Sequence, residues 1–173
     1  MKFYSGFTFK NDENCFKEYL QYSQYSVSGF SYGAIKAFEY VEKQLELGNR
    51  IDTLQLFSPA FFQTKSEKFK RLQTMSFKKD RDGYINSFIQ QCFSPYSIRN
   101  LEYIEATILD LNNLLSYEWL VSKLKNVVDK GVKIEVYLGG KDNIIDVQSA
   151  RELFLKVATV TYIKEANHFL QIN

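Results

Sequence analysis

The chain has 173 residues with a formal net charge of +2, and 45% of them are hydrophobic and 16% aromatic. A chain of this length can bury about 70% of the surface that it exposes when unfolded, so we expect one domain over residues 1–173. Two prolines and eight glycines are too few to indicate a linker between domains. One histidine and two isolated cysteines argue against a metal centre. The sequence also has no apolar run long enough for a membrane span or a signal peptide. We therefore expect a cytoplasmic protein with no cofactor and with neither nucleic acid nor membrane among its partners.

The first predicted elements frame a serine. Met1–Tyr4 and Tyr25–Ser28 are typical of short strands, with one short helix at Phe16–Tyr22 between them, and Ala34–Leu47 is typical of a helix. Gly29-Phe30-Ser31-Tyr32-Gly33 connects the second strand to that helix, which is the pattern of a nucleophile elbow. Glycine is expected at both ends of this motif, because side chains there would collide where the strand and the helix approach closely.

A long insert follows the next predicted strand, Ile51–Phe57. It covers about residues 61–115, and three of its segments carry apolar residues at three- and four-residue spacing. We predict helices at Lys65–Phe77, Gly83–Phe93 and Leu101–Leu111, and an amphipathic helix at Ser116–Asp129 that returns to the core.

Two further strands lead to the candidate partners of Ser31. Lys133–Leu138 runs into Gly-Gly-Lys-Asp142, and Val157–Ile163 precedes a loop with the only histidine, His168. The chain order nucleophile, acid, histidine is that of hydrolases with such an elbow. Asp146, four residues after Asp142, is the alternative acid.

These residues predict a catalytic triad. His168 would accept the proton of the Ser31 hydroxyl, while Asp142 would hold the other ring N–H and stabilise the imidazolium. The backbone N–H of Tyr32 and that of Phe7, or alternatively Thr8, would bind the oxyanion. The competing interpretation is that His168 is a packed residue and Asp142 a turn residue, and the joint occurrence in the required order favours the triad.

The layout resembles the α/β-hydrolase family. Lys2-Phe3-Tyr4-Ser5-Gly6-Phe7, the elbow and Leu56-Phe57-Ser58-Pro59-Ala60 are similar to the short BioV-type esterases of biotin synthesis. The resemblance implies hydrolysis of the methyl ester of pimeloyl-acyl-carrier-protein, with an acyl carrier protein as the partner and the insert as a lid over the site.

Compared with a full-length α/β-hydrolase, the chain is reduced. Only 24 residues separate Gly6 from Ser31, and Asn173 follows the last strand closely. We expect a reduced α/β-hydrolase fold of about five mostly parallel strands with right-handed crossovers, and the first strand at an exposed edge.

The insert is locally basic, with an excess of +4 over residues 65–82. Lys70, Arg71, Lys78 and Lys79 are the candidates for docking an acidic carrier, and the alternative is a solvated helix face. The aromatic residues of the insert predict a narrow apolar tunnel for the acyl chain.

Two other functions remain open. A thioesterase or acyltransferase acting on another acyl chain would use the same three residues. A degenerate hydrolase that only binds a partner would fit the reduced fold, although such a protein would be free to lose any of Ser31, Asp142 and His168.

Overall fold

The computed structural model describes residues 1–173, and its centre is one sheet of five parallel strands. Adjacent strands follow chain order across the sheet: β1 (Lys2–Tyr4), β3 (Ser26–Phe30), β4 (Thr53–Phe57), β6 (Lys133–Gly139) and β7 (Thr159–Ile163). The predicted α/β architecture of about five parallel strands is confirmed. Parallel strands place all carboxyl ends at one edge, so the loops after β1, β3, β6 and β7 meet there.

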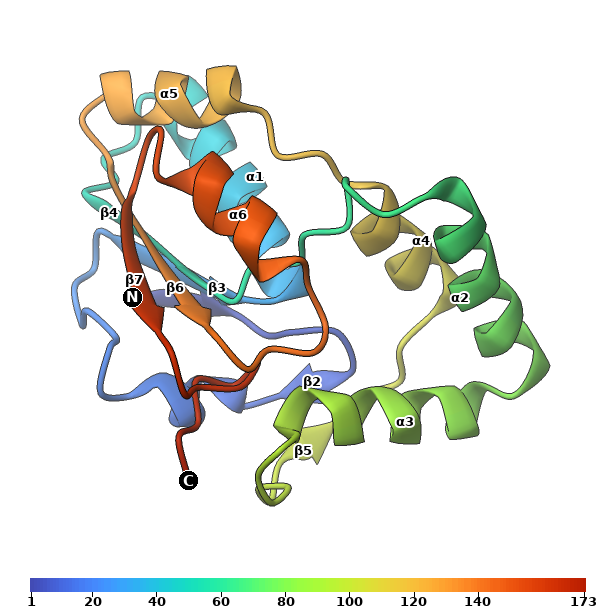
Figure 1. The fold of residues 1–173 in the computed structure, drawn as a ribbon. Coiled ribbons are helices and arrows are strands. Elements are labelled where there is room, and N and C mark those ends of the chain that lie inside the picture. Colours follow the sequence, from blue (N-terminus) through green and yellow to red (C-terminus); the bar gives the residue numbers. More distant parts are fainter.

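Three helices cover one face of this sheet, as Figure 1 shows: α1 (Tyr32–Glu46), α5 (Val121–Asp129) and α6 (Val147–Phe154). Ile35, Phe38 and Val41 of α1 recur at three-residue spacing and are buried against Leu54 and Leu56 of β4 in one apolar core. The sequence analysis did not predict α6, whose eight residues begin after Asp146. No helix is both long and apolar enough to cross a membrane.

The opposite face is covered by the connection from β1 to β3 (Figure 1). The predicted helix Phe16–Tyr22 is wrong: the chain forms a five-residue 3₁₀ helix, η1 (Asp12–Phe16), followed by turns. This connection moves across the sheet in the same direction as the crossover through α1 but on the other face, so the two have opposite hands. The expectation that every crossover shares the right-handed geometry is therefore wrong. The rule rests on a helix packing back onto the sheet, and this connection contains no α-helix.

Polar side chains hold that connection against the sheet. Gln55 of β4 accepts a hydrogen bond from the Gln21 N–H (2.9 Å) and donates to the Tyr19 carbonyl (2.8 Å) and to Glu135 of β6 (3.0 Å). Burial by itself would raise the pKa of Glu135, but hydrogen bonds from Lys133 and Gln55 bring it below its ordinary value. The network satisfies the backbone of a loop that a helix would otherwise satisfy internally.

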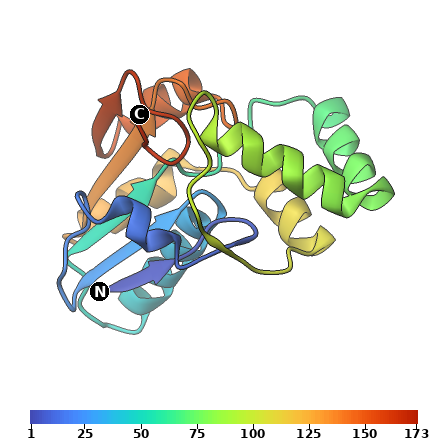
Figure 2. The same ribbon diagram turned by 90° about the horizontal axis from the view of Figure 1, so that it is seen from below.

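The insert forms a separate group of helices beside the sheet, seen from two directions in Figures 1 and 2. It contains α2 (Glu67–Lys79), α3 (Arg81–Phe93) and α4 (Ile108–Ser116). The predicted helix Leu101–Leu111 is wrong in its first half, because α4 begins only after Thr107, whose side chain and Asp110 form a capping box.

The predicted helix Ser116–Asp129 is wrong at its start, because α5 begins only at Val121. Residues 117–120 form neither helix nor strand between α4 and α5, and there Trp119 is buried with its indole N–H donating to the Ala60 carbonyl (2.8 Å). Burying this large side chain between the insert and the core outweighs continuation of the helix.

A small antiparallel pair, absent from the sequence analysis, ties the insert to the first loop. β2 (Phe9–Lys10) pairs with β5 (Glu102–Tyr103), and just before it Thr8 and Ile104 bond each other twice: the Ile104 N–H donates to the Thr8 carbonyl, and the Thr8 hydroxyl donates to the Ile104 carbonyl, both at 2.9 Å. The loop after β1 is therefore held by the segment that follows α3.

Candidate active site

Ser31 lies at a sharp turn between β3 and α1, at the carboxyl edge of the sheet. Its φ of +52° is unusual for a residue with a side chain and marks a strained backbone. A Cβ on Gly29 would lie 2.3 Å from the Gly33 carbonyl oxygen, and a Cβ on Gly33 would lie 2.0 Å from the Tyr4 carbonyl oxygen. Both glycines are therefore required by close approach, Gly33 against the end of β1 rather than against its own strand.

His168 lies in the loop after β7, and the preceding residue holds that loop. The Asn167 side chain donates to the Phe93 carbonyl at the end of α3 (2.7 Å) and accepts from the N–H groups of Phe169 and Gln171 (3.0 Å each). The His168 ring packs on Phe30, next to the nucleophile, with centroids 4.9 Å apart. The imidazole is thus fixed by its own loop, by α3 and by the elbow.

The structure brings the three predicted side chains into one hydrogen-bonded chain. His168 Nδ1 lies 2.6 Å from Asp142 Oδ2, and His168 Nε2 lies 3.0 Å from Ser31 Oγ. Because a carboxylate only accepts hydrogen bonds, Nδ1 carries the proton and Nε2 is free to accept that of the serine hydroxyl. The arrangement can transfer a proton from Ser31 to His168.

Asp142, rather than Asp146, reaches the histidine. The other oxygen of Asp142, Oδ1, accepts from the N–H groups of Ile144 (2.7 Å) and Ile145 (3.3 Å), which orients the carboxylate. Asp146 instead caps α6 by accepting from the Ser149 N–H (3.1 Å), and it also accepts from the Thr64 hydroxyl (2.8 Å). The alternative acid is thus a helix cap whose pKa is lowered by these hydrogen bonds against the effect of burial.

Two backbone N–H groups beside the elbow make no hydrogen bond, those of Tyr32 and Phe7, although both residues are buried. Free buried N–H groups are rare. The Ser31 carbonyl, in the same peptide as the Tyr32 N–H, accepts from the Ala34 and Ala60 N–H groups (3.1 Å each). Because carbonyl and N–H point in opposite directions in a trans peptide, the Tyr32 N–H is held pointing the other way. These groups have the properties of oxyanion donors, and that role remains a prediction.

A cavity of about 180 Å³ lies between the insert and the site. Its wall includes Phe7 from the first loop and Ile144 from the Asp142 loop, while the insert contributes mainly apolar side chains: Phe62, Phe69, Tyr84, Phe88, Leu111, Leu114 and Leu115. Burial raises the pKa of Tyr84 to about 12, so its hydroxyl stays protonated and donates to Gln73 (3.0 Å). Ser31 itself is only 3% exposed and does not line this cavity, which meets the site through Phe7 and through Asn143 and Ile144, the two residues after Asp142.

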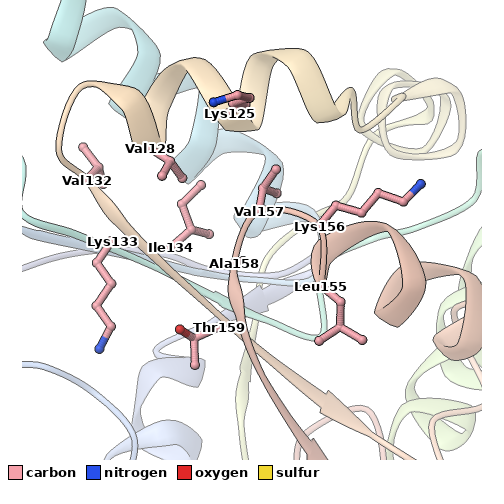
Figure 3. A pocket seen from close by; sticks show the side chains of 10 residues that line it. All are labelled: Lys125, Val128, Val132, Lys133, Ile134, Leu155, Lys156, Val157, Ala158 and Thr159. Atoms are coloured by element: carbon pink, nitrogen blue, oxygen red, sulfur yellow. The ribbon is translucent and has the colours of Figure 1, made fainter.

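A larger surface hollow of about 480 Å³, shown in Figure 3, lies far from this chemistry. It is lined by Lys133 and Ile134 at the start of β6, by Ala158 and Thr159 at the start of β7 and by the end of α5. It therefore opens at the amino ends of the strands, whereas the three polar side chains gather at the carboxyl ends. No group of three or more His, Cys, Asp or Glu side chains is placed to hold a metal ion.

The sequence analysis missed the residues that support this site. Asn167 immediately precedes the only histidine, and that adjacency is the one signal that could have found it. Asp12 is buried and accepts from the Gly6 N–H, but nothing in the pattern of residues 10–16 distinguishes it from Glu13 beside it.

The fold is that of α/β-hydrolases. No protein-family model matches the sequence, and no curated protein matches it. Among solved structures, the chain is similar to an esterase from Exiguobacterium antarcticum (TM-score 0.66, 18% identity, 83% of this chain and 59% of that one). It is also similar to a bromoperoxidase from Bacillus anthracis (TM-score 0.63, 14% identity, 83% of this chain and 60% of that one). A third similar structure is naproxen esterase from Bacillus subtilis (TM-score 0.56, 14% identity, 85% of this chain and 54% of that one).

The chain spans about 54 to 60% of the length of these three proteins. At such low identity the similarity establishes the fold and leaves the activity to be argued from the site.

Proposed function

We propose that this protein is a serine carboxylic ester hydrolase. The observation that carries the proposal is the hydrogen-bonded chain from Ser31 through His168 to Asp142 at the carboxyl edge of the sheet. This constellation is recognised by its geometry and roles, and it activates a hydroxyl that is otherwise a poor nucleophile at neutral pH. The names of the similar esterases agree with this class of reaction.

The proposed reaction has two stages. Ser31 Oγ forms a bond to the ester carbonyl carbon as His168 Nε2 takes the hydroxyl proton, and the N–H groups of Tyr32 and Phe7 bind the oxyanion. The bond to the alcohol oxygen then breaks, and His168 returns the proton to the departing alcohol. Water, deprotonated by His168, attacks the acyl-enzyme and releases a carboxylic acid and free Ser31.

The substrate we propose is the methyl ester of pimeloyl-acyl-carrier-protein. The resemblance to the short esterases of biotin synthesis suggests it, and the cavity beside the insert agrees with it. The cavity is lined mostly by apolar side chains, which suits a long thin acyl chain. If the carrier docks outside the insert, only the distal ester reaches Ser31, and remote binding energy then selects that ester over the thioester.

The docking surface we propose is the outer face of α2. Leu72 (49% exposed) and Met75 (54% exposed) form an apolar pair there, and Lys68, Arg71, Lys78 and Lys79 are exposed on the same helix. Cations around a small apolar patch are complementary to an acidic amphipathic partner. Lys70 is not part of this face, because its side chain is only 17% exposed and bonds Glu67 (2.9 Å).

The docking surface can be tested by reversing its charge. Replacing Arg71, Lys78 and Lys79 together by Glu is expected to lower kcat/KM for a carrier-bound ester at least tenfold at low salt, because the variant loses electrostatic steering and repels an acidic carrier, which slows association. Hydrolysis of a small p-nitrophenyl ester should stay within twofold. Raised salt should weaken the wild-type reaction with the carrier substrate in the same direction.

The matched control reverses Lys123, Lys125 and Lys130, which are exposed at the α5 side of the molecule, by the same total charge. This control should retain at least half of the activity on both substrates. Equal loss in the two triple variants, or equal loss on both substrates, would contradict docking on α2.

Labelling with a fluorophosphonate tests the proposed class. The wild-type protein should gain one covalent adduct at Ser31, whereas Ser31→Ala should gain none and His168→Ala should react far more slowly. Absence of an adduct on folded wild-type protein would contradict a hydrolase and favour a non-catalytic binding protein. An adduct together with faster turnover of acyl thioesters than of oxygen esters would instead identify a thioesterase.

A further inference from the structure

Asp12 is a buried carboxylate that the proposed reaction leaves without a role. Its residue is 0% exposed and it forms no ion pair; Oδ2 accepts a hydrogen bond from the Gly6 N–H (2.9 Å), and Oδ1 has no hydrogen-bond partner. Burial raises the pKa of Asp12, and the nearby Ser5 hydroxyl and the hydrogen bond from the Gly6 N–H only partly offset this. A buried carboxyl group with so few partners destabilises a fold, so its position next to the first loop calls for a physical reason.

Asp12 accepts its hydrogen bond from the Gly6 N–H, one residue before Phe7, whose N–H is the candidate oxyanion donor. Gly6 donates its N–H to Asp12, while its carbonyl accepts from the Phe9 N–H (3.2 Å) and closes a tight turn. The Gly6 carbonyl and the Phe7 N–H belong to one planar trans peptide, so the two groups point in opposite directions. Both peptides that meet at Gly6 are therefore held, and the Phe7 N–H is left pointing out of the turn without a partner.

The same turn contains a strained residue. Thr8 has a φ of +66°, which is uncommon for a β-branched side chain, and it is held in place by its two hydrogen bonds with Ile104. A Cβ on Gly6 would lie 2.7 Å from the ring of Phe30, the residue that precedes Ser31. The turn therefore packs closely against the nucleophile elbow. Strain of this kind persists only where the surroundings enforce it.

We propose that Asp12 is a positioning residue that orients the Phe7 N–H toward the oxyanion. Asp12 fixes the start of the turn by accepting from the Gly6 N–H, and Ile104 fixes the other end through its two hydrogen bonds with Thr8. The proposal rests on the proposed function, because it assigns the turn a role only if Ser31 forms a tetrahedral adduct. It goes beyond that function by naming the side chain that fixes one of the two oxyanion donors.

Two substitutions separate hydrogen bonding from packing. Asp12→Asn keeps an oxygen that can accept from the Gly6 N–H, whereas Asp12→Leu is similar in size and accepts nothing. With a p-nitrophenyl ester, Asp12→Asn should retain kcat within about threefold. Asp12→Leu should lose about 10- to 100-fold in kcat with KM within threefold, since an oxyanion donor acts in the transition state and a misplaced one loses part of the roughly 10²- to 10³-fold effect of such a donor. Equal losses in both variants, or full activity of a folded Asp12→Leu, would overturn the proposal.

A measurement on the wild-type protein covers the case in which Asp12→Leu does not fold. An alkyl boronic acid forms a tetrahedral adduct with an active serine, and amide NMR spectra should then show downfield shifts of both the Phe7 and Tyr32 N–H protons. A boronate adduct at Ser31 that shifts Tyr32 but leaves Phe7 unchanged would overturn the role of Asp12 while leaving the esterase intact. Failure of the folded protein to form any adduct would overturn the proposed function and this inference together.

Discussion

Replacing Ser31 by alanine is expected to lower kcat for ester hydrolysis by about 10⁴- to 10⁶-fold, and replacing His168 by alanine should have a similar effect. The two side chains touch through Nε2 and Oγ at 3.0 Å, so neither performs its part of the proton transfer alone. The double variant should therefore be little worse than either single one. The comparison uses initial rates with a p-nitrophenyl ester. The enzyme concentration must be high enough to detect the remaining activity of the variants.

Folding must be controlled in this experiment, because both side chains are buried. The circular dichroism spectrum of each variant should match that of the folded wild type. The thermal midpoint should change little for Ser31→Ala, which removes one hydroxyl, and should fall for His168→Ala, which removes a buried ring. A folded single variant that retains more than a tenth of the activity would show that the residue is not part of the catalytic unit.

The second large effect is expected at Asp142. Asp142→Asn should lower kcat by about 10⁴-fold, because an amide N–H facing Nδ1 favours the tautomer in which Nε2 carries the proton and cannot accept that of Ser31. The carboxylate now bonds Nδ1 at 2.6 Å. The pH-independent plateau of kcat for the variant and the wild type is the quantity to compare.

Asp146→Asn is the matched control, four residues away in the same loop. Asparagine caps helices about as well as aspartate, so α6 should keep its start and the activity should stay within threefold. The opposite ranking of the two variants would move the acid of the site to Asp146 and contradict the geometry.

Much of the architecture could be predicted because local patterns decide it. Five short segments rich in β-branched and aromatic residues became the five strands, with no end shifted by more than two residues. The helices at α1, α2 and α3 followed from apolar spacing along single elements. The predictions failed where a contact distant in sequence outweighed the local pattern. Trp119 lies in the non-helical start of a predicted helix and donates to the Ala60 carbonyl, and residues 102–103 pair with β2 instead of joining α4.

The sequence by itself determined the order of Ser31, Asp142 and His168 and the end of the strand that each follows, because elbow glycines and strand-forming residues are local signals. Only the tertiary structure decided that Asp142 rather than Asp146 meets His168, that Lys70 faces away from the other cations of α2, and that Asp12 and Asn167 support the loops of the site. The physical reason is that these outcomes depend on tertiary packing. Asp142 meets His168 from 26 positions away, and Asn167 meets Phe93 from 74 positions away. Lys70 and Asp12 bond partners only three and six positions away, but what packs around them decides their burial. Residue spacing along the sequence does not show which groups pack together in the folded chain.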